Sequence, residues 1–322
     1  MRPFQATLPA LALLVLVDCA SPAPPEDDSV WFTPNLGSLD LVDLFSRPDG
    51  WARARSSTRV FKFYEENLIS AAPADCPLCG PNLLPDLVSR GAFVALSSWG
   101  LRIAIEVPVV KSWSCDTLLA RSRAQEALHN VEASGAAVRF LAMDEPLLGG
   151  EGCGLDPGAS AARVQGFIAD AQVGRPSLAV GDIEPYPRFS VSDIEAWTTA
   201  LEASGTRPAF FHLDVDRVEA DRRKANLAAD LQSFEAFFQG RGIPFGVILW
   251  GQGASDRAYY DDVRAWVATV SRDLGRPRQL VFQSWAAGEK GQRTIPDNLP
   301  ESDPTVYSHT RLVNDGLAAF PP

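Results

Sequence analysis

The features that this chain lacks exclude several classes of partner. It has no run of five or more Lys or Arg residues, and 29 basic side chains stand against 40 acidic ones, for a net charge of −11. Nucleic-acid binding needs a basic stripe that meets the phosphates. We therefore expect neither nucleic acid nor an anionic membrane surface as a partner. Only 3 His residues are present, which leaves few nitrogen ligands for a metal site.

Two catalytic motifs are also missing from the sequence. No G-x-S-x-G nucleophile elbow and no phosphate-cradling P-loop occurs. A serine hydrolase of the elbow type and a P-loop enzyme are therefore disfavoured, although a Ser-His-Asp triad assembled in space stays open. The composition, with 46% hydrophobic and 21% charged residues, is typical of a folded globular protein.

The apolar run near the start of the chain, Leu8 to Val17, is too short to cross a bilayer, which takes about 20 residues. With Arg2 before it, the run has the size and flanks of a secretory signal, and we predict a signal peptide over residues 1–19. A buried strand or helix is the alternative. Residues 20–29 are rich in Pro and acidic side chains and indicate a flexible linker.

The residues before Cys19 resemble the lipobox of bacterial lipoproteins, whose cysteine is lipidated. The small residue that normally precedes that cysteine is replaced here by Asp18. We therefore expect a secreted or periplasmic protein without a membrane span, and both plain secretion and a lipid anchor at Cys19 remain open.

The cysteines beyond Cys19 are even in number, which in an exported chain predicts two disulfides. They are Cys76, Cys79, Cys115 and Cys153, and three pairings are open. The Cys-x-x-Cys spacing of the first two is also that of half a zinc ribbon or of a redox motif. Because the other two are far apart in sequence, structural bridges are favoured and no metal is predicted.

Short apolar runs alternate with amphipathic stretches along the chain. The runs predict eight strands buried on both faces, over residues 30–35, 59–64, 101–107, 138–145, 177–184, 209–216, 245–251 and 279–285. The stretches between them predict helices over residues 38–56 (broken), 82–96, 117–134, 159–173, 191–204, 224–239 and 256–274. Most of these end near a Gly, and Ser190 or Ser192 and Asp256 are expected caps.

Eight strands with helices between them predict a single (β/α)8 barrel of the TIM type over residues 30–322. A doubly wound open sheet is the alternative, but it needs a Gly-rich turn after the first strand, and residues 34–38 contain one Gly. Residues 286–322 show no helical period, so we expect an irregular tail over the barrel mouth. We expect a monomer.

Polar side chains gather at the predicted carboxyl ends of these strands, where a barrel carries its chemistry. They are Asn35, Lys62, Tyr64, Glu106, Asp144, Glu145, Asp182, Glu184, His212, Asp214, Asp216, Trp250, Gln252, Gln283 and Trp285. Acids stand at four consecutive strand ends, while the opening halves of the same strands are apolar. For any single acid, a solvated loop position remains an alternative.

Two carboxylates in one cavity with aromatic walls suit glycoside hydrolysis. One acid must stay protonated to give its proton to the leaving oxygen, and the other must be ionised. Crowding and partial burial would separate the two pKa values in this way. Trp250 and Trp285 are well placed to stack on a sugar, with core packing as their alternative role.

Met143-Asp144-Glu145-Pro146 after the fourth strand resembles the Asn-Glu-Pro signature of barrel glycoside hydrolases of the large retaining clan. The resemblance implies that Glu145 is the acid/base and that Asp144, in place of Asn, lies near the sugar 2-hydroxyl. A Trp at the end of strand eight is also similar to that clan. The clan's nucleophile Glu should end strand seven, where this sequence has Trp250 and Gln252.

A substitute for that nucleophile is offered by strand five. Neighbouring strands lie about 4.8 Å apart, so Glu145 and Glu184 would lie near the roughly 5–5.5 Å of a retaining pair. We predict Glu145 as general acid and Glu184 as its partner, with a carbohydrate substrate and no cofactor. Asp214, two strands from Glu145, better suits an inverting base. Supporting roles at the sugar or in charge balance are expected for Lys62, Glu106, Asp144, Asp182, His212 and Asp214.

Two other functions remain open from the sequence. A metal-dependent sugar isomerase or epimerase could bind Mn²⁺ or Mg²⁺ through Glu106, Glu184, His212, Asp214 and Asp216. A non-catalytic carbohydrate-binding barrel is favoured by the missing Glu on strand seven, since a fold does not fix a function.

Overall fold

The computed structural model describes residues 28–70, 82–285 and 296–320. The predicted signal peptide, residues 20–27 of the predicted linker, Cys19, Cys76 and Cys79 lie outside these residues. So does the first part of the predicted tail, residues 286–295.

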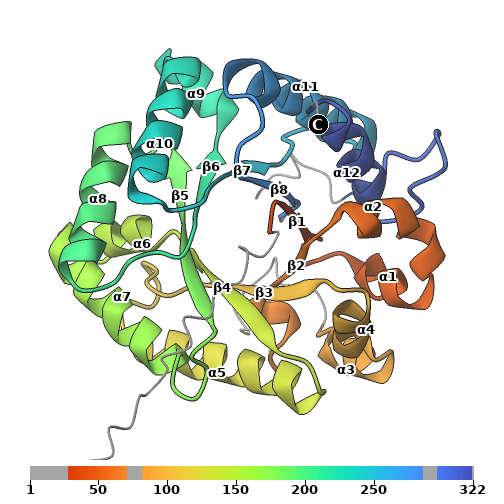
Figure 1. The fold of residues 1–322 in the computed structure, drawn as a ribbon, viewed down its shortest axis with the longest axis horizontal. Helices are drawn as coiled ribbons and strands as arrows, with labels where there is room; N and C mark the ends of the chain where they lie inside the picture. The colour runs from red at the N-terminus through yellow and green to blue at the C-terminus, as the bar shows by residue number, and fades with distance from the viewer. Residues whose placement is uncertain (1–27, 71–81, 286–295, 321–322) are drawn as a thin grey trace, which may run out of the picture.

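Eight parallel strands close into a barrel in chain order, with helices around the outside (Figure 1). The strands are β1 (Val30–Thr33), β2 (Val60–Tyr64), β3 (Arg102–Val107), β4 (Val138–Asp144), β5 (Ala179–Tyr186), β6 (Phe211–Val215), β7 (Phe245–Leu249) and β8 (Gln279–Gln283). The predicted TIM-type barrel is confirmed, and each predicted strand overlaps an observed one.

The helices fill the connections, and none of those described is long and apolar enough to cross a membrane. With 3-10 turns labelled η, they are η1 (Leu39–Val42), α1 (Asp43–Ser46), η2 (Pro48–Trp51), α2 (Ala52–Ser57), η3 (Glu65–Asn67), α3 (Leu84–Ser89), α4 (Ala92–Ser98), α5 (Thr117–Ala133), α6 (Pro146–Gly152), α7 (Pro157–Ala171), α8 (Val191–Ala203), α9 (Arg217–Arg223), α10 (Leu227–Arg241), α11 (Asp256–Asp273) and α12 (His309–Leu317). The short helices α6 and α9, directly after β4 and β6, were not predicted.

The C-terminal tail is irregular only in part. Residues 296–308 contain no helix or strand, but the tail then forms α12, which packs against α11 and α2 and closes the helical ring after β8 (Figure 1). Ser308 caps this helix by accepting from the amide of Arg311, and Leu312 and Val313 are buried. The helix is only 9 residues long and partly polar, so its period was easily missed.

Helix ends largely follow the expected chemistry. The Ser190 side chain accepts from the amide of Asp193 at the start of α8, as predicted. The cap of α11 is Ser255 rather than Asp256. Helix α10 runs past Gly240 and ends before Gly242, whose φ of 63° is the left-handed conformation that glycine adopts without strain.

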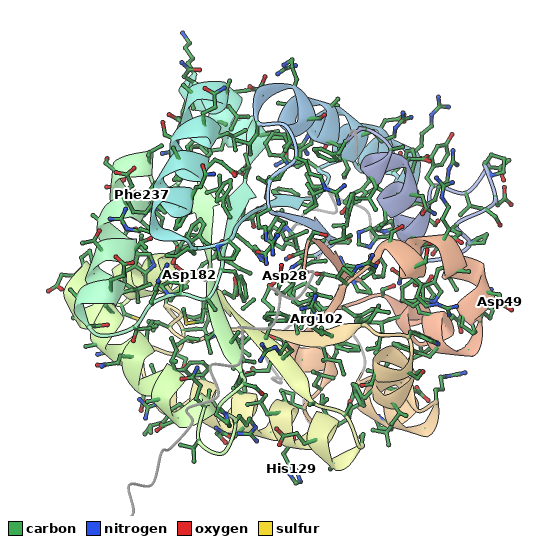
Figure 2. The ribbon with its side chains drawn as sticks, in the orientation of Figure 1. Asp28, Asp49, Arg102, His129, Asp182 and Phe237 are labelled. Carbon is green, nitrogen blue, oxygen red and sulfur yellow. A yellow bond between two sulfur atoms is a disulfide. The ribbon has the colours of Figure 1, made fainter. Side chains whose placement is uncertain are left out.

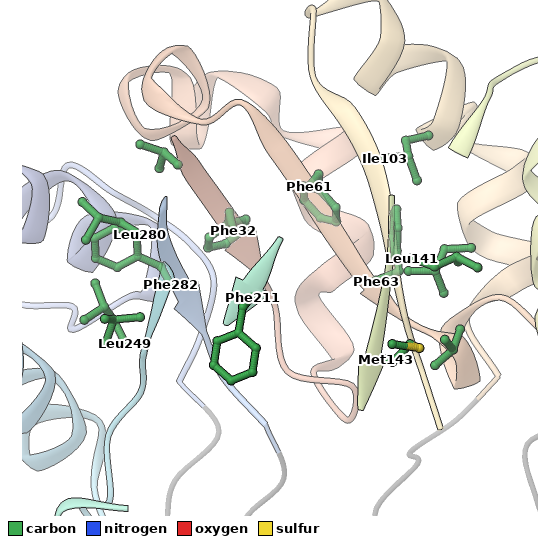
Figure 3. Packing of buried hydrophobic residues seen from close by; sticks show 14 of the residues in the cluster. Phe32, Phe61, Phe63, Ile103, Leu141, Met143, Phe211, Leu249, Leu280 and Phe282 are labelled. Atoms are coloured by element: carbon green, nitrogen blue, oxygen red, sulfur yellow. The ribbon is translucent and has the colours of Figure 1, made fainter. Parts of the chain in front are cut away.

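The core has two layers, one on each face of the barrel wall. Side chains such as Phe61, Leu141 and Phe211 pack between strands and helices in the outer layer (Figure 3). The barrel interior is filled by Trp31, Val60, Ala104, Phe140, Ala142, Ile183, Phe210, Ile248, Trp250 and Val281. Successive side chains on a strand point to opposite faces, so this division fixes which polar residues reach the mouth.

Candidate active site

A cavity of about 310 Å³ opens at the carboxyl ends of the strands. This volume falls in the range of small-molecule sites. Its lining residues are Leu36, Tyr64, Glu66, Glu106, Pro108, Lys111, Trp113, Asp144, Glu145, Ile183, Asp214, Gln283 and Trp285. The structure therefore brings together seven predicted site residues: Tyr64, Glu106, Asp144, Glu145, Asp214, Gln283 and Trp285.

The floor of the cavity is a buried polar network. Lys62 is fully buried and donates to Glu106 and, at 2.7 Å, to Oε1 of Gln283. Burial raises the pKa of Glu106, and the neighbouring Lys62 opposes that shift. The Tyr64 hydroxyl donates to the carbonyl of Ser284 at 2.9 Å. A buried charge is tolerated only when it is paired, so this network holds its members in fixed positions.

Glu145 lies at the junction of β4 and α6 in a left-handed backbone conformation, with φ 50° and ψ 53°. A side chain with a Cβ adopts this conformation at a cost, and Pro146 follows it as the first residue of α6. The Glu145 amide donates to the carbonyl of Ile183 at 3.0 Å, which ties the turn to β5. Strain of this kind is concentrated at functional sites.

The environment of Glu145 favours the protonated form of its carboxyl. Burial, reinforced by the nearby charges of Asp144 and Asp214, raises its pKa to about 8, although Lys111 acts in the opposite direction. Nζ of Lys111 lies 2.6 Å from Oδ2 of Asp144 and 3.4 Å from Oε2 of Glu145. At neutral pH, Glu145 is therefore largely protonated.

Asp214 faces the same cavity from β6, two strands away from Glu145. Its carboxylate accepts a hydrogen bond from the indole N–H of Trp250. The ring of Trp250 meets that of Trp285 edge-on, with centroids 5.7 Å apart. The hydrogen bond from Trp250 therefore fixes the orientation of the Asp214 carboxyl, and Trp285 adds an indole to the cavity wall.

The loop between β3 and α5 carries Lys111 and Trp113 and is held against α6. A Cβ on Gly149 would lie 1.7 Å from the carbonyl oxygen of Val110, so only glycine allows this approach. The Cys115–Cys153 disulfide joins the end of the loop to the residue after α6. This bridge belongs to one of the three open cysteine pairings. The second bridge of that pairing would join Cys76 and Cys79, which lie outside the described residues.

Glu184 does not face Glu145 across the cavity, which corrects the predicted pair. Ile183 points into the barrel, so Asp182 and Glu184 on either side of it point toward the helices. Oε1 of Glu184 accepts from the amide of Leu147, at the N-terminus of α6, at 2.6 Å. Burial raises its pKa well above the usual range, and the residue supports α6 from behind the barrel wall.

Asp182 lies between β5 and α8 (Figure 2). Its Oδ2 accepts from the indole N–H of Trp197 at 2.8 Å. Burial raises the pKa of Asp182 to about 8. The side chain is fully buried and does not line the cavity. Its predicted contact with substrate is therefore not provided by this geometry.

The remaining predicted residues lie behind the cavity wall or below it. His212 is buried in the barrel interior against Trp31, where it meets Gln279 at 2.9 Å and burial lowers its pKa to about 3. Asn35 is buried and donates to the Ser284 hydroxyl at 3.2 Å. Lys62 and Trp250 do not line the cavity. Each donates a hydrogen bond to a lining acid, Lys62 to Glu106 and Trp250 to Asp214.

Sequence reasoning missed Lys111 and Trp113, which come from a loop rather than a strand end. Lys111 is buried beside two acids, whereas Trp113 is 72% exposed at the rim. A signal was present, because the third strand is followed by the short segment Lys111-Ser-Trp113 in a βα loop, and these loops build barrel active sites. Glu66, in η3 after β2, was missed for the same reason.

The described residues contain no group of three or more His, Cys, Asp or Glu side chains placed to hold a metal ion. The ligand set considered for an isomerase is divided by the fold. Glu106 and Asp214 face the cavity, Glu184 faces the helices, and His212 lies in the interior. Asp216 caps α9. These donors therefore do not form one site.

Comparison with known proteins gives similarity in fold. No family model matches the chain, and no curated protein matches it in sequence. Among solved structures, it is similar to the Ignisphaera aggregans GH53 catalytic domain, with a TM-score of 0.52 and 11% identity over 93% of this chain and 98% of that one. An alpha-amylase from Lactobacillus plantarum gives a TM-score of 0.49 and 9% identity, over 92% of this chain and 80% of that one.

Fold and site together define a class: a (β/α)8 barrel whose mouth holds an acidic cavity with indole walls. The 7,8-dihydropteroate synthase from Vibrio fischeri ES114 is also similar, with a TM-score of 0.47 and 10% identity over 91% of this chain and 92% of that one. Because the barrel supports many chemistries, these similarities describe architecture, and the function has to be argued from the site.

Proposed function

We propose that this protein is a glycoside hydrolase with Glu145 as its general acid. The observation that carries the proposal is the position of Glu145: a strained, largely protonated carboxyl in a cavity that also holds Asp214 and Trp285. A carboxylic acid that keeps its proton at neutral pH can deliver it to a leaving glycosidic oxygen. A non-catalytic sugar-binding barrel has no need of such an acid.

Asp214 is the best-supported partner of Glu145, in place of Glu184. Strands β4 and β6 are separated by β5, and two strand spacings of about 4.8 Å place their ends about 9.6 Å apart, at the upper end of the roughly 6.5–9.5 Å of an inverting pair. Such a gap leaves room for a water molecule between the base and the sugar. We therefore propose an inverting mechanism, which also agrees with the absence of a Glu after β7.

The reaction balances with these two groups. The Glu145 O–H gives its proton to the glycosidic oxygen as the bond from that oxygen to the anomeric carbon breaks, and the bond electrons stay on the oxygen. A water oxygen attacks the anomeric carbon from the opposite face and gives a proton to Asp214. The products are a free sugar of inverted configuration and an alcohol, and solvent exchange returns each carboxyl to its starting state.

The first test compares two kinds of substrate. Neutral tetrasaccharides need a protonated leaving group, whereas glycosyl fluorides lose fluoride without one. We expect Glu145→Gln to lower kcat/KM on the tetrasaccharide by about 10²–10⁴-fold, the size of a general-acid contribution, and to affect the fluoride far less. Asp214→Asn should lower both, because both substrates need an activated water.

The control is Asp86→Asn, which removes a carboxylate at an exposed position on α3 outside the cavity and should leave both substrates cleaved as by the wild type. NMR of the first product should show inversion at the anomeric carbon. Retention of configuration would reject Asp214 as a base. If the wild-type protein binds the tetrasaccharides but cleaves neither them nor the glycosyl fluorides, the hydrolase proposal is rejected and a binding barrel is supported.

A further inference from the structure

A second hollow of about 400 Å³ adjoins the barrel mouth on the side of α6. It shares Lys111, Trp113 and Glu145 with the first cavity, and we call it the α6 hollow. Its own wall includes Leu148 from α6 and Arg188 from the segment after β5. Glu145 therefore stands between two adjoining spaces, each large enough for a small-molecule ligand.

We propose that the α6 hollow binds the sugar on the leaving-group side, so that the substrate is a neutral oligosaccharide or polysaccharide lying across Glu145. This inference rests on the proposed function. Asp214 lines the barrel mouth and not the α6 hollow, so the water that it activates attacks an anomeric carbon in the mouth. The leaving sugar then lies beyond the proton donor, in the α6 hollow.

Trp113 provides an aromatic surface at the junction of the two spaces. Its side chain is 72% exposed although it is one of the largest apolar groups in the chain, and it lines both hollows. Nζ of Lys111 lies 5.8 Å from the ring centroid, and the loop is fixed by the Cys115–Cys153 disulfide. An exposed indole beside a cavity suits the apolar face of a sugar ring.

The charges around both hollows favour a neutral chain over an anionic one. Besides Glu145, four carboxyls line the cavity at the barrel mouth: Glu66, Glu106, Asp144 and Asp214. The cations on the described walls are already engaged, since Lys111 pairs with Asp144, and Arg188 lies 2.6 Å from Glu151. A uronate or sulfated sugar would meet repulsion without a compensating partner.

The test fills the α6 hollow without changing the mouth. Leu148→Trp adds bulk to a residue that lines only the α6 hollow, and Leu118→Trp on α5 is the control at an exposed position outside both hollows. Substrates are the cello-, xylo-, manno- and galactotetraoses, the matching glycosyl fluorides, and polygalacturonate as an anionic polymer. A fluoride ion is too small to need a leaving-group site.

We expect Leu148→Trp to lower kcat/KM on the cleaved tetrasaccharide at least tenfold more than on the fluoride of the same sugar. Leu118→Trp should match the wild type on both, and polygalacturonate should not be cleaved. Equal effects of Leu148→Trp on both substrates, or cleavage of polygalacturonate in preference to the neutral chains, would overturn the inference while leaving the hydrolase intact. Wild-type inactivity on every substrate would reject the proposed function itself and this inference with it.

Discussion

At the scale of single residues, the protonation state of Glu145 depends on two opposing effects on its pKa, that of its buried, acidic surroundings and that of Lys111. Burial and two neighbouring acids hold the proton on Glu145, while Lys111 favours the ionised form. The Glu-Pro signature was enough to predict from the sequence that Glu145 lies at the cavity, because the residue follows its strand directly. Lys111 could not be predicted in this way, since only the folding of the β3–α5 loop brings it to Asp144.

This balance predicts how Lys111→Met changes the pH profile. The acid works only when protonated, so activity should fall as the pH rises through the pKa of Glu145, which is about 8. Removing the Lys111 charge raises that pKa, so the alkaline limb of kcat/KM should move upward. Lys111→Arg, which keeps the charge, is the control. A limb that stays in place or moves downward in Lys111→Met would contradict the assignment.

At the scale of elements, α6 organises the site from the edge of the barrel. Its N-terminus is held by Glu184 from behind the sheet, and its glycines let the Lys111 loop approach closely. The sequence predicted the flanking strands but not this helix, which is only 7 residues long and rich in glycine. Glycine-rich segments have low helix propensity, so tertiary contacts decide their structure.

Gly149→Ala should therefore disturb both stability and activity. The new Cβ would meet the Val110 carbonyl, a backbone atom that cannot turn aside, and overpacking of this kind costs about 1–3 kcal/mol. We expect a lower Tm by calorimetry and a lower kcat, because the loop carrying Lys111 must move. The control is Gly240→Ala in α10, where a Cβ meets no atom within 4 Å and the Tm should rise slightly. Equal Tm values for the two variants would show that the α6 contact is not tight.

At the scale of the whole molecule, buried acids on the outer face of the barrel make stability depend on pH. Asp182, Glu184 and Glu65 are all fully buried, and burial raises the pKa of each. Between about pH 4 and pH 8 the native state holds a proton on Asp182 that the unfolded chain has released. The free energy of unfolding should therefore fall as the pH rises through this window.

Asp182→Asn tests this dependence. Asparagine keeps an oxygen for the Trp197 indole N–H but does not ionise. At pH 8 we expect the variant to be more stable than the wild type by about 5 kcal/mol, because the pKa of Asp182 rises by about four units and each unit is worth about 1.4 kcal/mol, and we expect the two stabilities to converge near pH 4. Asp221→Asn, at an exposed position on α9, should follow the wild-type curve. Thermal melts from pH 4 to 8 measure the effect, and parallel curves for wild type and Asp182→Asn would refute it.

The barrel could be predicted from the sequence alone, because eight buried strands separated by helices leave few other ways to cover a parallel sheet. The presence of acids and indoles at the strand ends could be predicted in the same way. Which of these acids share the cavity depends on the folded chain. Successive side chains on a strand point to opposite faces, so the register of each strand decides which of its acids reaches the cavity. Glu184 on β5 points toward the helices, whereas Asp214 on β6 points into the cavity that also holds Glu145.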